Sequence, residues 1–369
     1  MRILVAPDCF TGSLTAAEAA SSITQGWLQT CPGDDFITIP MSDGGPGFID
    51  SVCIALGATR VPCIVRDPLG RDVPAEFALL GERAWIESAQ ACGLAHLEPD
   101  ERDPAKTSTY GVGQLIEIAI NHGAKNVTIG LGGSGTNDAG AGALAALGAQ
   151  ADAALDHGGY SLRDVQTIDL QPARERVRDV QLTIASDVDN PLLGLRGASA
   201  VFGPQKGASE ELVMQLEGSL EHFAQVCGRR DDGKDPAVAL GAGAAGGLGY
   251  GLMLIGAGRI SGIEAIMDML HIDQAIHDVD LVITGEGCLD DQSLHGKVIA
   301  GIAARAAKIG KPCVAVAGQV RLGKREASAA GIDSAYSMTE LVGKEQSMSA
   351  PQETLTALAA RVATTWGRR

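Results

Sequence analysis

Four acidic side chains in this sequence stand at or shortly after the ends of short apolar runs that predict β-strands. These acids are Asp8, Asp43, Asp187 and Glu286. In open α/β sheets, ligands bind beyond the carboxyl ends of the strands, so acids in equivalent places beside glycines favour one shared site. Carboxylates provide the hard oxygen ligands that Mg²⁺ prefers, and they can accept the proton of a hydroxyl nucleophile. A single acid after a strand is equally a helix cap, and this alternative stays open.

The glycine-rich segment at residues 130–142 is the most informative motif in the chain. It follows a predicted strand at 126–129 and precedes an alanine-rich predicted helix. Glycines allow backbone amides to converge on an anion at a helix N-terminus. The segment therefore predicts phosphate or substrate binding, with a tightly packed turn as the alternative. The candidate ligands are Gly132, Gly133, Ser134, Thr136, Asn137 and Asp138.

A second glycine-rich segment, at 241–246, matches the dinucleotide fingerprint G-x-G-x-x-G, with Glu264 at about the right distance beyond it. The residues before it form a poor strand that contains Pro236, so an NAD site is not predicted. Gly243 and Gly246 remain candidates for a loop that faces phosphate or adenine. A purely packing role for them is the open alternative.

Two further segments place charges beside turn residues. Lys206 lies on a glycine-flanked loop, where lysine is a useful point charge for a phosphate or carboxylate, although most lysines are simply solvated. Glu286 and Asp290 lie near one strand end, and Lys297 opens the next predicted helix. This second segment predicts a metal or ATP-phosphate site, or a capped helix start. The chain has no Walker A motif and no protein-kinase signature.

The composition limits the partners and the compartment. The net charge of -16 makes nucleic acid and anionic membranes poor partners, so any anion site must be built locally. The eight cysteines show no CxxC pair and no zinc spacing, which favours reduced thiols and a cytoplasmic location. No apolar stretch of about 20 residues is present and the N-terminus lacks a signal-peptide pattern, so we expect no membrane span.

The order of the predicted elements indicates two α/β domains, as a length of 369 residues also suggests. A strand at 3–6, a helix at 16–28 and a strand at 36–39 have the rhythm of a parallel doubly wound sheet. Aromatic residues are only 4%, while 48 glycines and many alanines favour closely packed helices and sheets. The last hundred residues return to the same rhythm.

Short strands without helices begin near residue 61 and predict a mixed sheet. Later in the same region we expect a strand at 184–187 and a helix at 210–227. The expected organisation is a discontinuous parallel-sheet domain, 1–60 and 270–369, with an α/β domain inserted at 61–269.

Seven segments, in the same order along nearly the whole chain, resemble the glycerate kinase family. They lie at residues 6–10, 40–45, 132–138, 187–192, 202–208, 241–247 and 284–287. The resemblance implies ATP-dependent phosphorylation of a hydroxyl of D-glycerate, usually giving 2-phosphoglycerate, with Mg²⁺. It also implies a Rossmann- or flavodoxin-like domain with an inserted α/β domain and an active site in the cleft.

The resemblance also implies roles for individual residues. Asp8 or Asp43 would orient or deprotonate the acceptor hydroxyl, while other residues would hold the ATP phosphates and magnesium. Those expected to act in catalysis are Asp8, Asp43, Asp187 and Lys206, and those expected to bind the metal are Asp187 and Asp290. To the ATP and substrate ligands of the first glycine-rich segment, the resemblance adds Asn190, Gly243, Gly246, Glu286 and Lys297.

Five positions depart from the family's usual motifs. Cys9 and Thr11 replace a serine and a lysine, and Cys288 replaces an arginine. Pro46 and Phe48 replace a glutamate and a threonine. Three charged groups are therefore lost from loops expected to face one site, although phosphoryl transfer relies on cations that offset charge in the transition state.

These departures keep other functions open. One is a family kinase acting on a different hydroxy acid or polyol, and another is a non-catalytic binding protein on the same fold. An NAD-binding enzyme is a distant alternative. The sequence does not give the acceptor, the phosphorylated carbon or the assembly state, a homodimer included.

Overall fold

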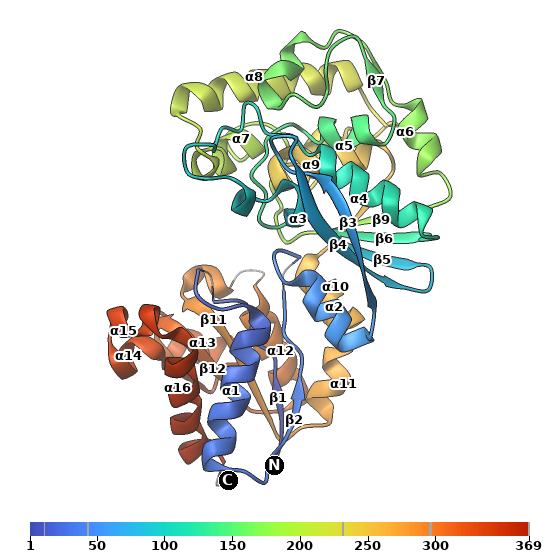
Figure 1. Ribbon diagram of the computed structural model, residues 1–369. Coiled ribbons are helices and arrows are strands. Elements are labelled where there is room, and N and C mark those ends of the chain that lie inside the picture. Colours follow the sequence, from blue (N-terminus) through green and yellow to red (C-terminus); the bar gives the residue numbers. More distant parts are fainter. Residues whose placement is uncertain (11, 43, 231, 295–296, 368–369) are drawn as a thin grey trace. The chain divides into compact units, whose positions relative to one another are not determined.

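The computed structural model describes residues 1–10, 12–42, 44–230, 232–294 and 297–367, which form two compact units (Figure 1). Unit 1 comprises Met1–Asp43, Asp50–Leu56 and Ile263–Arg369, and unit 2 comprises Gly44–Ile49 and Gly57–Gly262. Each unit has its own sheet, and each is described by itself. The division into domains at 61–269 stays a prediction.

The sheet of unit 1 has five parallel strands in the order β2-β1-β11-β12-β13. The strands are β1 (Arg2–Val5), β2 (Asp35–Thr38), β11 (Leu281–Leu289), β12 (Cys313–Val320) and β13 (Ser334–Ser337). Numbered along the unit, this is the order 2-1-3-4-5 of flavodoxin-like folds, which confirms the predicted parallel-sheet architecture. The direction of strand addition reverses between β1 and β11, and ligands bind at such a switch point in this class of fold.

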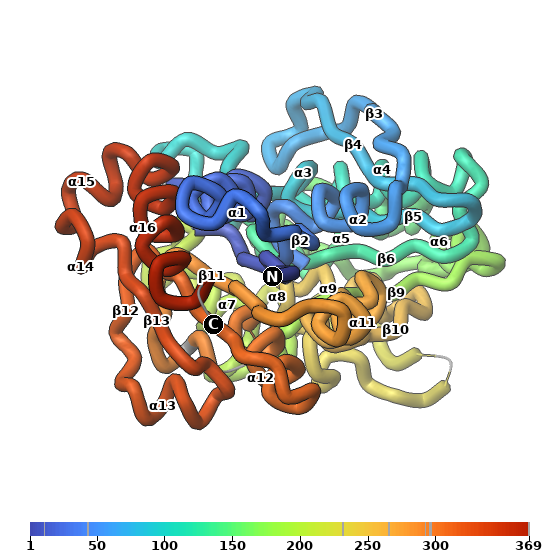
Figure 2. Tube along the Cα trace, turned by 90° about the horizontal axis from the view of Figure 1, so that it is seen from below, coloured from blue at the N-terminus to red at the C-terminus, as the bar shows by residue number. Residues whose placement is uncertain are grey.

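Helices cover both faces of this sheet, with α1 and α16 on one face and α12 on the other (Figure 2). The helices of unit 1 are α1 (Ala16–Thr30), α11 (Ile272–His277), α12 (Val298–Ile309), α13 (Lys324–Ala329), α14 (Met338–Val342), α15 (Lys344–Ser349) and α16 (Pro351–Trp366), with the 3-10 turn η5 (Asp291–Leu294). Two helices cross the unit boundaries, α2 (Phe48–Leu56) and α10 (Gly262–Met269).

Local sequence explains how α1 begins and packs. Thr15 and Glu18 form a capping box, in which each side chain accepts a hydrogen bond from the other residue's backbone N–H. Further along the helix, Gly26 faces α16 so closely that a Cβ there would overlap the carbonyl oxygen of Thr356. Glycine therefore sets the short distance between the two helices.

The sheet of unit 2 has six strands in the order β10-β9-β6-β5-β4-β3. The strands are β3 (Thr59–Arg66), β4 (Asp72–Leu80), β5 (Arg83–Glu87), β6 (Asn126–Gly130), β9 (Gln181–Ala185) and β10 (Gly258–Ile260). Strands β3, β4 and β5 pair antiparallel and the rest pair parallel, which confirms the predicted mixed sheet. Glu87 pairs with Gly130, and Gly130 with Ala185, so the loops after β5, β6 and β9 begin side by side.

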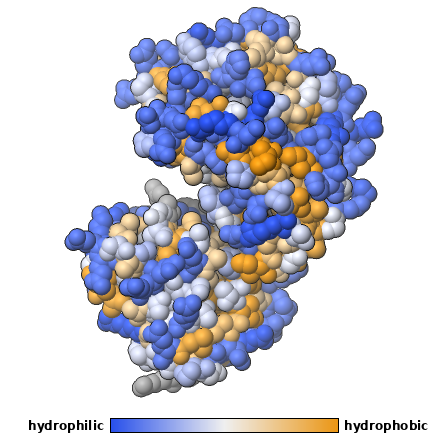
Figure 3. Space-filling model, viewed as in Figure 1, coloured by the Kyte–Doolittle hydropathy of each residue, from blue (hydrophilic) through white to orange (hydrophobic). Residues whose placement is uncertain are grey.

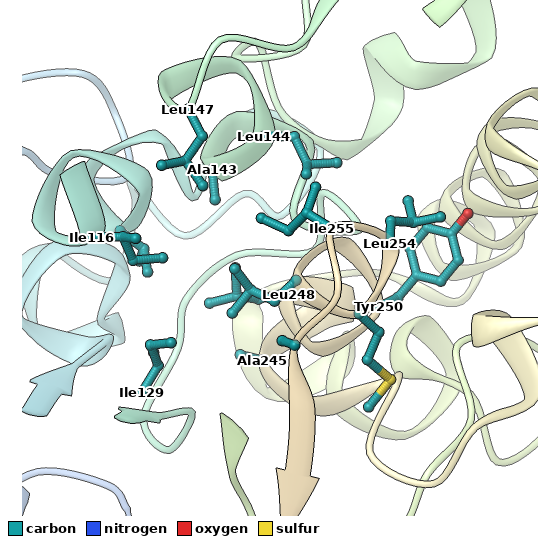
Figure 4. Close-up of a cluster of buried hydrophobic side chains, with 14 of the residues drawn as sticks. Ile116, Ile129, Ala143, Leu144, Leu147, Ala245, Leu248, Tyr250, Leu254 and Ile255 are labelled. Atoms are coloured by element: carbon teal, nitrogen blue, oxygen red, sulfur yellow. The ribbon is translucent and has the colours of Figure 1, made fainter. Parts of the chain in front are cut away.

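The core of unit 2 lies between this sheet and its helices (Figure 4). Ile116 from α4, Leu144 from α5 and Leu248 from α9 are fully buried there. The longer helices of unit 2 are α4 (Tyr110–Asn121), α8 (Glu210–Cys227) and α9 (Ala244–Leu254), and the shorter ones are α3 (Ala89–Cys92), α5 (Ala141–Ala146), α6 (Gln171–Arg176) and α7 (Ala198–Phe202). The 3-10 turns are η1 (Leu94–His96), η2 (Gly159–Asp164), η3 (Pro204–Lys206) and η4 (Pro236–Val238). A separate strand pair consists of β7 (Gln150–Ala151) and β8 (Ile168–Asp169).

Hydrophilic residues cover much of the visible surface of each unit (Figure 3). Among the described residues, no helix combines the length and the apolar character needed to cross a membrane.

Candidate active site

The switch point of unit 1 brings Asp8 and Glu286 to neighbouring strand ends. The backbone N–H of Asp8 donates to the carbonyl of Gly285 at 2.8 Å, so Asp8 lies beside the residue that precedes Glu286. The carboxylate of Asp8 accepts from the backbone N–H of Cys9 at 2.7 Å. The backbone N–H of Met41 donates to the carbonyl of Pro7 at 2.8 Å, which draws the segment after β2 to the same edge. The structure therefore brings residues of three predicted motifs, 6–10, 40–45 and 284–287, to this edge of the sheet.

Glu286 is a buried carboxyl whose two oxygens differ. The residue is only 6% exposed, and burial raises the pKa of its carboxyl. One oxygen, Oε2, lies 3.7 Å from Nζ of Lys297. The other, Oε1, is buried and has no hydrogen-bond partner within the described part of the chain. An unsatisfied buried oxygen is costly, so Oε1 is an atom that a ligand donor would satisfy.

The turn after β11 carries Cys288 and Asp290. The Cys288 thiol lies 3.7 Å from Oδ2 of Asp290, and the backbone N–H of Asp290 donates to Oγ of Ser293 at 3.0 Å. Burial raises the pKa of Cys288, and the positive charge of Arg321 partly opposes that rise. The positive charge of Arg321 therefore acts at Cys288, the position where the family usually has an arginine.

Arg321 is a residue that the sequence alone did not single out. It follows β12, and its backbone N–H donates to the carbonyl of Leu289 at 2.8 Å. Its guanidinium donates to the amide oxygen of Gln319 at 2.9 Å. The signal in the sequence was a cation directly after the strand-forming run that ends at Val320.

In unit 2, residues 44–49 pack against the carboxyl ends of β5 and β6. The backbone N–H of Gly47 donates to Oε2 of Glu87 at 3.0 Å, and that of Gly132 donates to the carbonyl of Gly44 at 3.2 Å. A Cβ at Gly132 would overlap the backbone of Gly45. Gly132 is therefore required for this close approach. The sequence alone did not single out Glu87, although Glu87 is also an acid at the end of a strand.

Phe48 has a packing role at the start of α2. Its side chain is fully buried, and it lies 3.0 Å from the position that a Cβ on Gly130 would take. The ring therefore fills interior space in unit 2, and its size gives no support to a changed acceptor. Thr11 and Asp43, the latter a predicted catalytic residue, lie outside the described residues.

Every polar side chain between Ser134 and Asp138 is buried. Ser134 is 8% exposed, and three further residues are completely buried: Thr136, Asn137 and Asp138. Nζ of Lys206 donates to Oγ of Ser134 at 3.0 Å and to the carbonyl of Thr136 at 2.7 Å. Nδ2 of Asn137 donates to Oγ of Ser199 at 3.0 Å. The structure thus joins the predicted residue Lys206 to the first glycine-rich segment.

Asp138 anchors the beginning of α5. Its carboxylate accepts from the backbone N–H and the hydroxyl of Thr109, and from the backbone N–H groups of Gly140 and Gly142, at 2.8–3.2 Å. Burial raises the pKa of the Asp138 carboxyl, and these four hydrogen bonds oppose the rise. In this structure Asp138 faces the interior.

The loop surface itself consists of backbone. Gly133 is exposed and has a φ of +76°, a conformation that glycine adopts without strain. The backbone N–H groups of Gly133 and Ser134 make no hydrogen bond within the described part of the chain. Successive amides of this kind suit an anion such as a phosphate group.

A second group of polar residues lies at the ends of β9 and β10. Oδ1 of Asp187 accepts from the hydroxyl of Ser261 at 3.1 Å. Nη2 of Arg259 donates to the carbonyl of Ser186 at 2.9 Å and to Oδ1 of Asp189 at 2.7 Å. The sequence alone did not single out Arg259, a cation within a short strand that was not predicted. It lies beside the backbone that carries Asp187.

The remaining predicted ligands of unit 2 make backbone contacts. Nδ2 of Asn190 donates to the carbonyl of Arg196 at 2.7 Å, and the carbonyl of Asn190 accepts from the backbone N–H of Gly243 at 2.9 Å. A Cβ at Gly246 would overlap the carbonyl of Thr136, so the two glycine-rich segments touch. The turn η4, not a strand, precedes the 241–246 segment, which agrees with the prediction against a dinucleotide fold.

Magnesium ligands were predicted at Asp187 and Asp290, which belong to different units. Within the described residues, no group of three or more histidine, cysteine or acidic side chains is arranged to hold a metal ion. Mg²⁺ in nucleotide sites takes one or two carboxylates and completes its shell with phosphate oxygens and water. Both carboxylates are half-buried and offer hard oxygens, so either suits a metal that arrives with a nucleotide.

Comparison with known proteins decides which family this geometry belongs to. The sequence matches the glycerate kinase family over residues 3–367. The chain belongs to the glycerate kinase family. It is 41% identical over 350 residues to a glycerate kinase of Haemophilus influenzae, covering 93% of this chain and 92% of that protein. It is likewise 41% identical over 352 residues to the glycerate 2-kinase of Escherichia coli, covering 93% and 92% of the two chains.

Solved structures agree with this membership. A crystal structure assigned to glycerate kinase 2 of Salmonella typhimurium has a TM-score of 0.83 and 38% sequence identity. The match covers 100% of this chain and 98% of that one. As a member of the glycerate kinase family, the chain is a phosphotransferase that acts on an alcohol group, and ATP is the phosphate donor that such a kinase implies.

Proposed function

We propose that this protein transfers the γ-phosphoryl group of ATP to the 2-hydroxyl of D-glycerate, giving 2-phosphoglycerate, with Mg²⁺. The observation that carries the proposal is the buried Glu286 carboxyl beside Asp8 at the switch point of unit 1, with one oxygen unsatisfied. Family relatives named glycerate kinase and glycerate 2-kinase support the choice of acceptor and product.

Glu286 and Asp8 are the groups proposed to handle the acceptor hydroxyl. The bond from the γ-phosphorus to its bridging oxygen breaks as a bond to the hydroxyl oxygen forms, and the hydroxyl proton passes to a carboxylate. A carboxyl with a raised pKa is a better proton acceptor than an ordinary one once it is ionised, and burial gives Glu286 that property. Lys297, 3.7 Å from Glu286, and Arg321, whose charge acts on Cys288, are cations at this edge that are proposed to bind the acceptor's carboxylate.

The loop at 132–137 in unit 2 is proposed to bind phosphate oxygens through its backbone. The chain carries a net charge of -16, so an anion site depends on local donors, and the amides of Gly133 and Ser134 are such donors. Asp187 in unit 2 and Asp290 in unit 1 are each proposed as an oxygen ligand for magnesium, which offsets charge on the phosphates. Catalytic roles for Asp43 and Asp187 stay part of the proposal.

Phosphorus NMR of the purified protein with Mg-ATP and D-glycerate tests this function. We expect ADP and a new phosphate ester, with phosphorus coupled to the single proton on carbon 2. An ester coupled to the two protons of carbon 3 would replace the proposed product while keeping the substrate. ATP that stays unconsumed with D-glycerate would overturn the proposal.

A second candidate is a family kinase with a different acceptor. Cys288, a neutral thiol at the edge of the unit 1 sheet, is the observation that favours it, because the family usually has an arginine there. The same NMR assay with a panel of hydroxy acids and polyols separates the two candidates. A new ester from another acceptor, formed faster than from D-glycerate, would favour this second function.

We also infer a cytoplasmic location. None of the eight cysteines forms a disulfide within the described residues. The two most buried, Cys92 and Cys313, have pKa values raised by burial, which makes them unreactive. Cysteines that form no disulfides are typical of a reducing compartment. A homodimer remains a prediction.

A further inference from the structure

We propose that Lys206 is a positioning residue, which holds the 132–137 loop from the interior so that the loop's backbone amides bind the anionic substrate. The proposal rests on the function proposed above for that loop. In this proposal the Lys206 ammonium does not touch the phosphate. It holds Ser134 and Thr136, and the backbone amides of the loop contact the phosphate instead.

The burial of Lys206 excludes it from the loop surface. The residue is 2% exposed, yet its ammonium is satisfied by Oγ of Ser134 at 3.0 Å and the carbonyl of Thr136 at 2.7 Å. An ammonium group in the interior costs free energy unless it is hydrogen-bonded or paired. Burial lowers the pKa of Lys206 to about 8, while the neighbouring Cys92 and Asp138 act in the opposite direction. Within the described part of the chain, Cys92 and Asp138 are the titratable groups whose charge acts on Lys206.

The turn that carries Lys206 is built to direct its side chain inward. The turn η3 is flanked by Gly203 and Gly207. A Cβ at Gly203 would overlap the carbonyl of Ser199, and one at Gly207 would overlap that of Arg102. Gly207 also has a φ of +98°, which favours glycine. Close packing therefore explains why glycines surround this lysine in the sequence.

The loop has the complementary arrangement. Its polar side chains point inward, toward Lys206 in the case of Ser134 and toward Ser199 in the case of Asn137. Its exposed part is the backbone around Gly133. A loop rich in glycine pays a large conformational entropy to be ordered, and two hydrogen bonds from one buried ammonium offset part of that cost.

Hydrogen exchange and steady-state kinetics on three variants test the proposal. The variants are Lys206→Met, Ser134→Ala and the double variant. In the protein without ligands, we expect exchange at 132–137 to be faster in Lys206→Met, and to a smaller extent in Ser134→Ala. The hydrogen-bonded amides of Gly132 and Gly135 should show this effect. We expect kcat/KM for Mg-ATP to fall about 10-fold or more in Lys206→Met, since a misplaced loop loses transition-state contacts. The double variant should equal Lys206→Met, because both changes remove the same contact.

Lys234→Met, at an exposed lysine of the same unit, is the matched control and should match the parent protein in both measurements. Unchanged exchange at 132–137 together with lost Mg-ATP binding would overturn the proposal in favour of direct phosphate contact. Additive losses in the double variant would also overturn it. If Lys206→Met does not fold, exchange in Ser134→Ala decides alone, and an unchanged rate there counts against the proposal. The exchange measurement needs no turnover, so failure of the proposed activity is seen separately.

Discussion

At the scale of single residues, three buried ionisable groups differ in how they are satisfied. Asp138 accepts four hydrogen bonds and Lys206 donates two, while Oε1 of Glu286 has no partner in the described part of the chain. Fully satisfied buried groups stabilise the fold around them, whereas an unsatisfied one needs another explanation. A ligand that binds at Glu286 is the explanation consistent with its position at a switch point.

Glu286→Gln should lower activity and change the dependence of stability on pH. Removing the proposed proton acceptor should lower kcat by about 100-fold, the lower end of the range for general base catalysis. Burial raises the pKa of Glu286 in the folded state, so the folded protein binds an extra proton between the ordinary value of 4.5 and the raised value. The free energy of unfolding should therefore fall, relative to that of Glu286→Gln, as the pH rises through this interval.

Urea unfolding of both proteins between pH 4.5 and 8, with initial rates at pH 7.5, measures these effects. Glu345→Gln, at an exposed glutamate of α15, should change neither quantity and serves as the control. A Glu286→Gln variant with unchanged kcat would remove Glu286 from the proton transfer. A constant stability difference across the pH range would contradict the raised pKa.

At the scale of elements, the sequence predicts best where local signals agree. The helix at 210–227 has the predicted bounds, because Ser209 caps its start and Gly228 follows its end. The helix at 16–28 extends two residues further, to Thr30. The strand expected at 184–187 lies at 181–185, which leaves Asp187 in the loop where an acid is accessible. Strand ends shift readily because pairing partners, not local propensity, determine them.

The sequence could not predict which way polar loop residues face. Ser134, Thr136 and Asn137 were expected to bind substrate, yet their side chains face the interior. Their inward orientation depends on Lys206 and Ser199, which lie more than 60 residues further along the chain. Contacts of this kind are set by tertiary packing, as is the contact between residues 44–49 and the end of β6. The role of Arg321 likewise depends on the pairing of β11 with β12.

The contact between α1 and α16 provides a prediction at this scale. Gly26→Ala places a Cβ against the carbonyl of Thr356, so we expect the free energy of unfolding to fall by about 1–3 kcal/mol. Gly218→Ala, within α8, is the matched control because a Cβ there meets nothing within 4 Å. It should stabilise the protein by about 0.5–1 kcal/mol, the ordinary gain from replacing glycine in a helix. Thermal unfolding followed by circular dichroism measures both.

If the free energy of unfolding falls in Gly26→Ala and rises in Gly218→Ala, the difference is explained by the packing of α1 against α16. If Gly26→Ala stabilises the protein as much as Gly218→Ala does, the two helices do not approach as closely as described, and the prediction fails.

At the scale of the whole molecule, the family match spans residues 3–367, so the resemblance covers the sequences of both units and not one motif. The net charge of -16 belongs to this scale as well. A protein of this charge repels an anionic nucleotide at long range, while the amides and cations of its site attract the same ligand at short range. Salt weakens the long-range part first, because exposed charges are screened beyond the Debye length.

We therefore expect Mg-ATP to bind faster at moderate ionic strength than at low ionic strength. The Debye length falls from about 30 Å at 0.01 M to about 8 Å at 0.15 M, which removes most of the repulsion. Stopped-flow binding of a fluorescent ATP analogue should show an association rate that rises about 2- to 5-fold over this interval. Binding of uncharged adenosine, measured in the same way, should not change. An association rate that falls steadily with added salt would mean that local cations such as Arg259 and Arg321 outweigh the net charge even during the approach of the nucleotide.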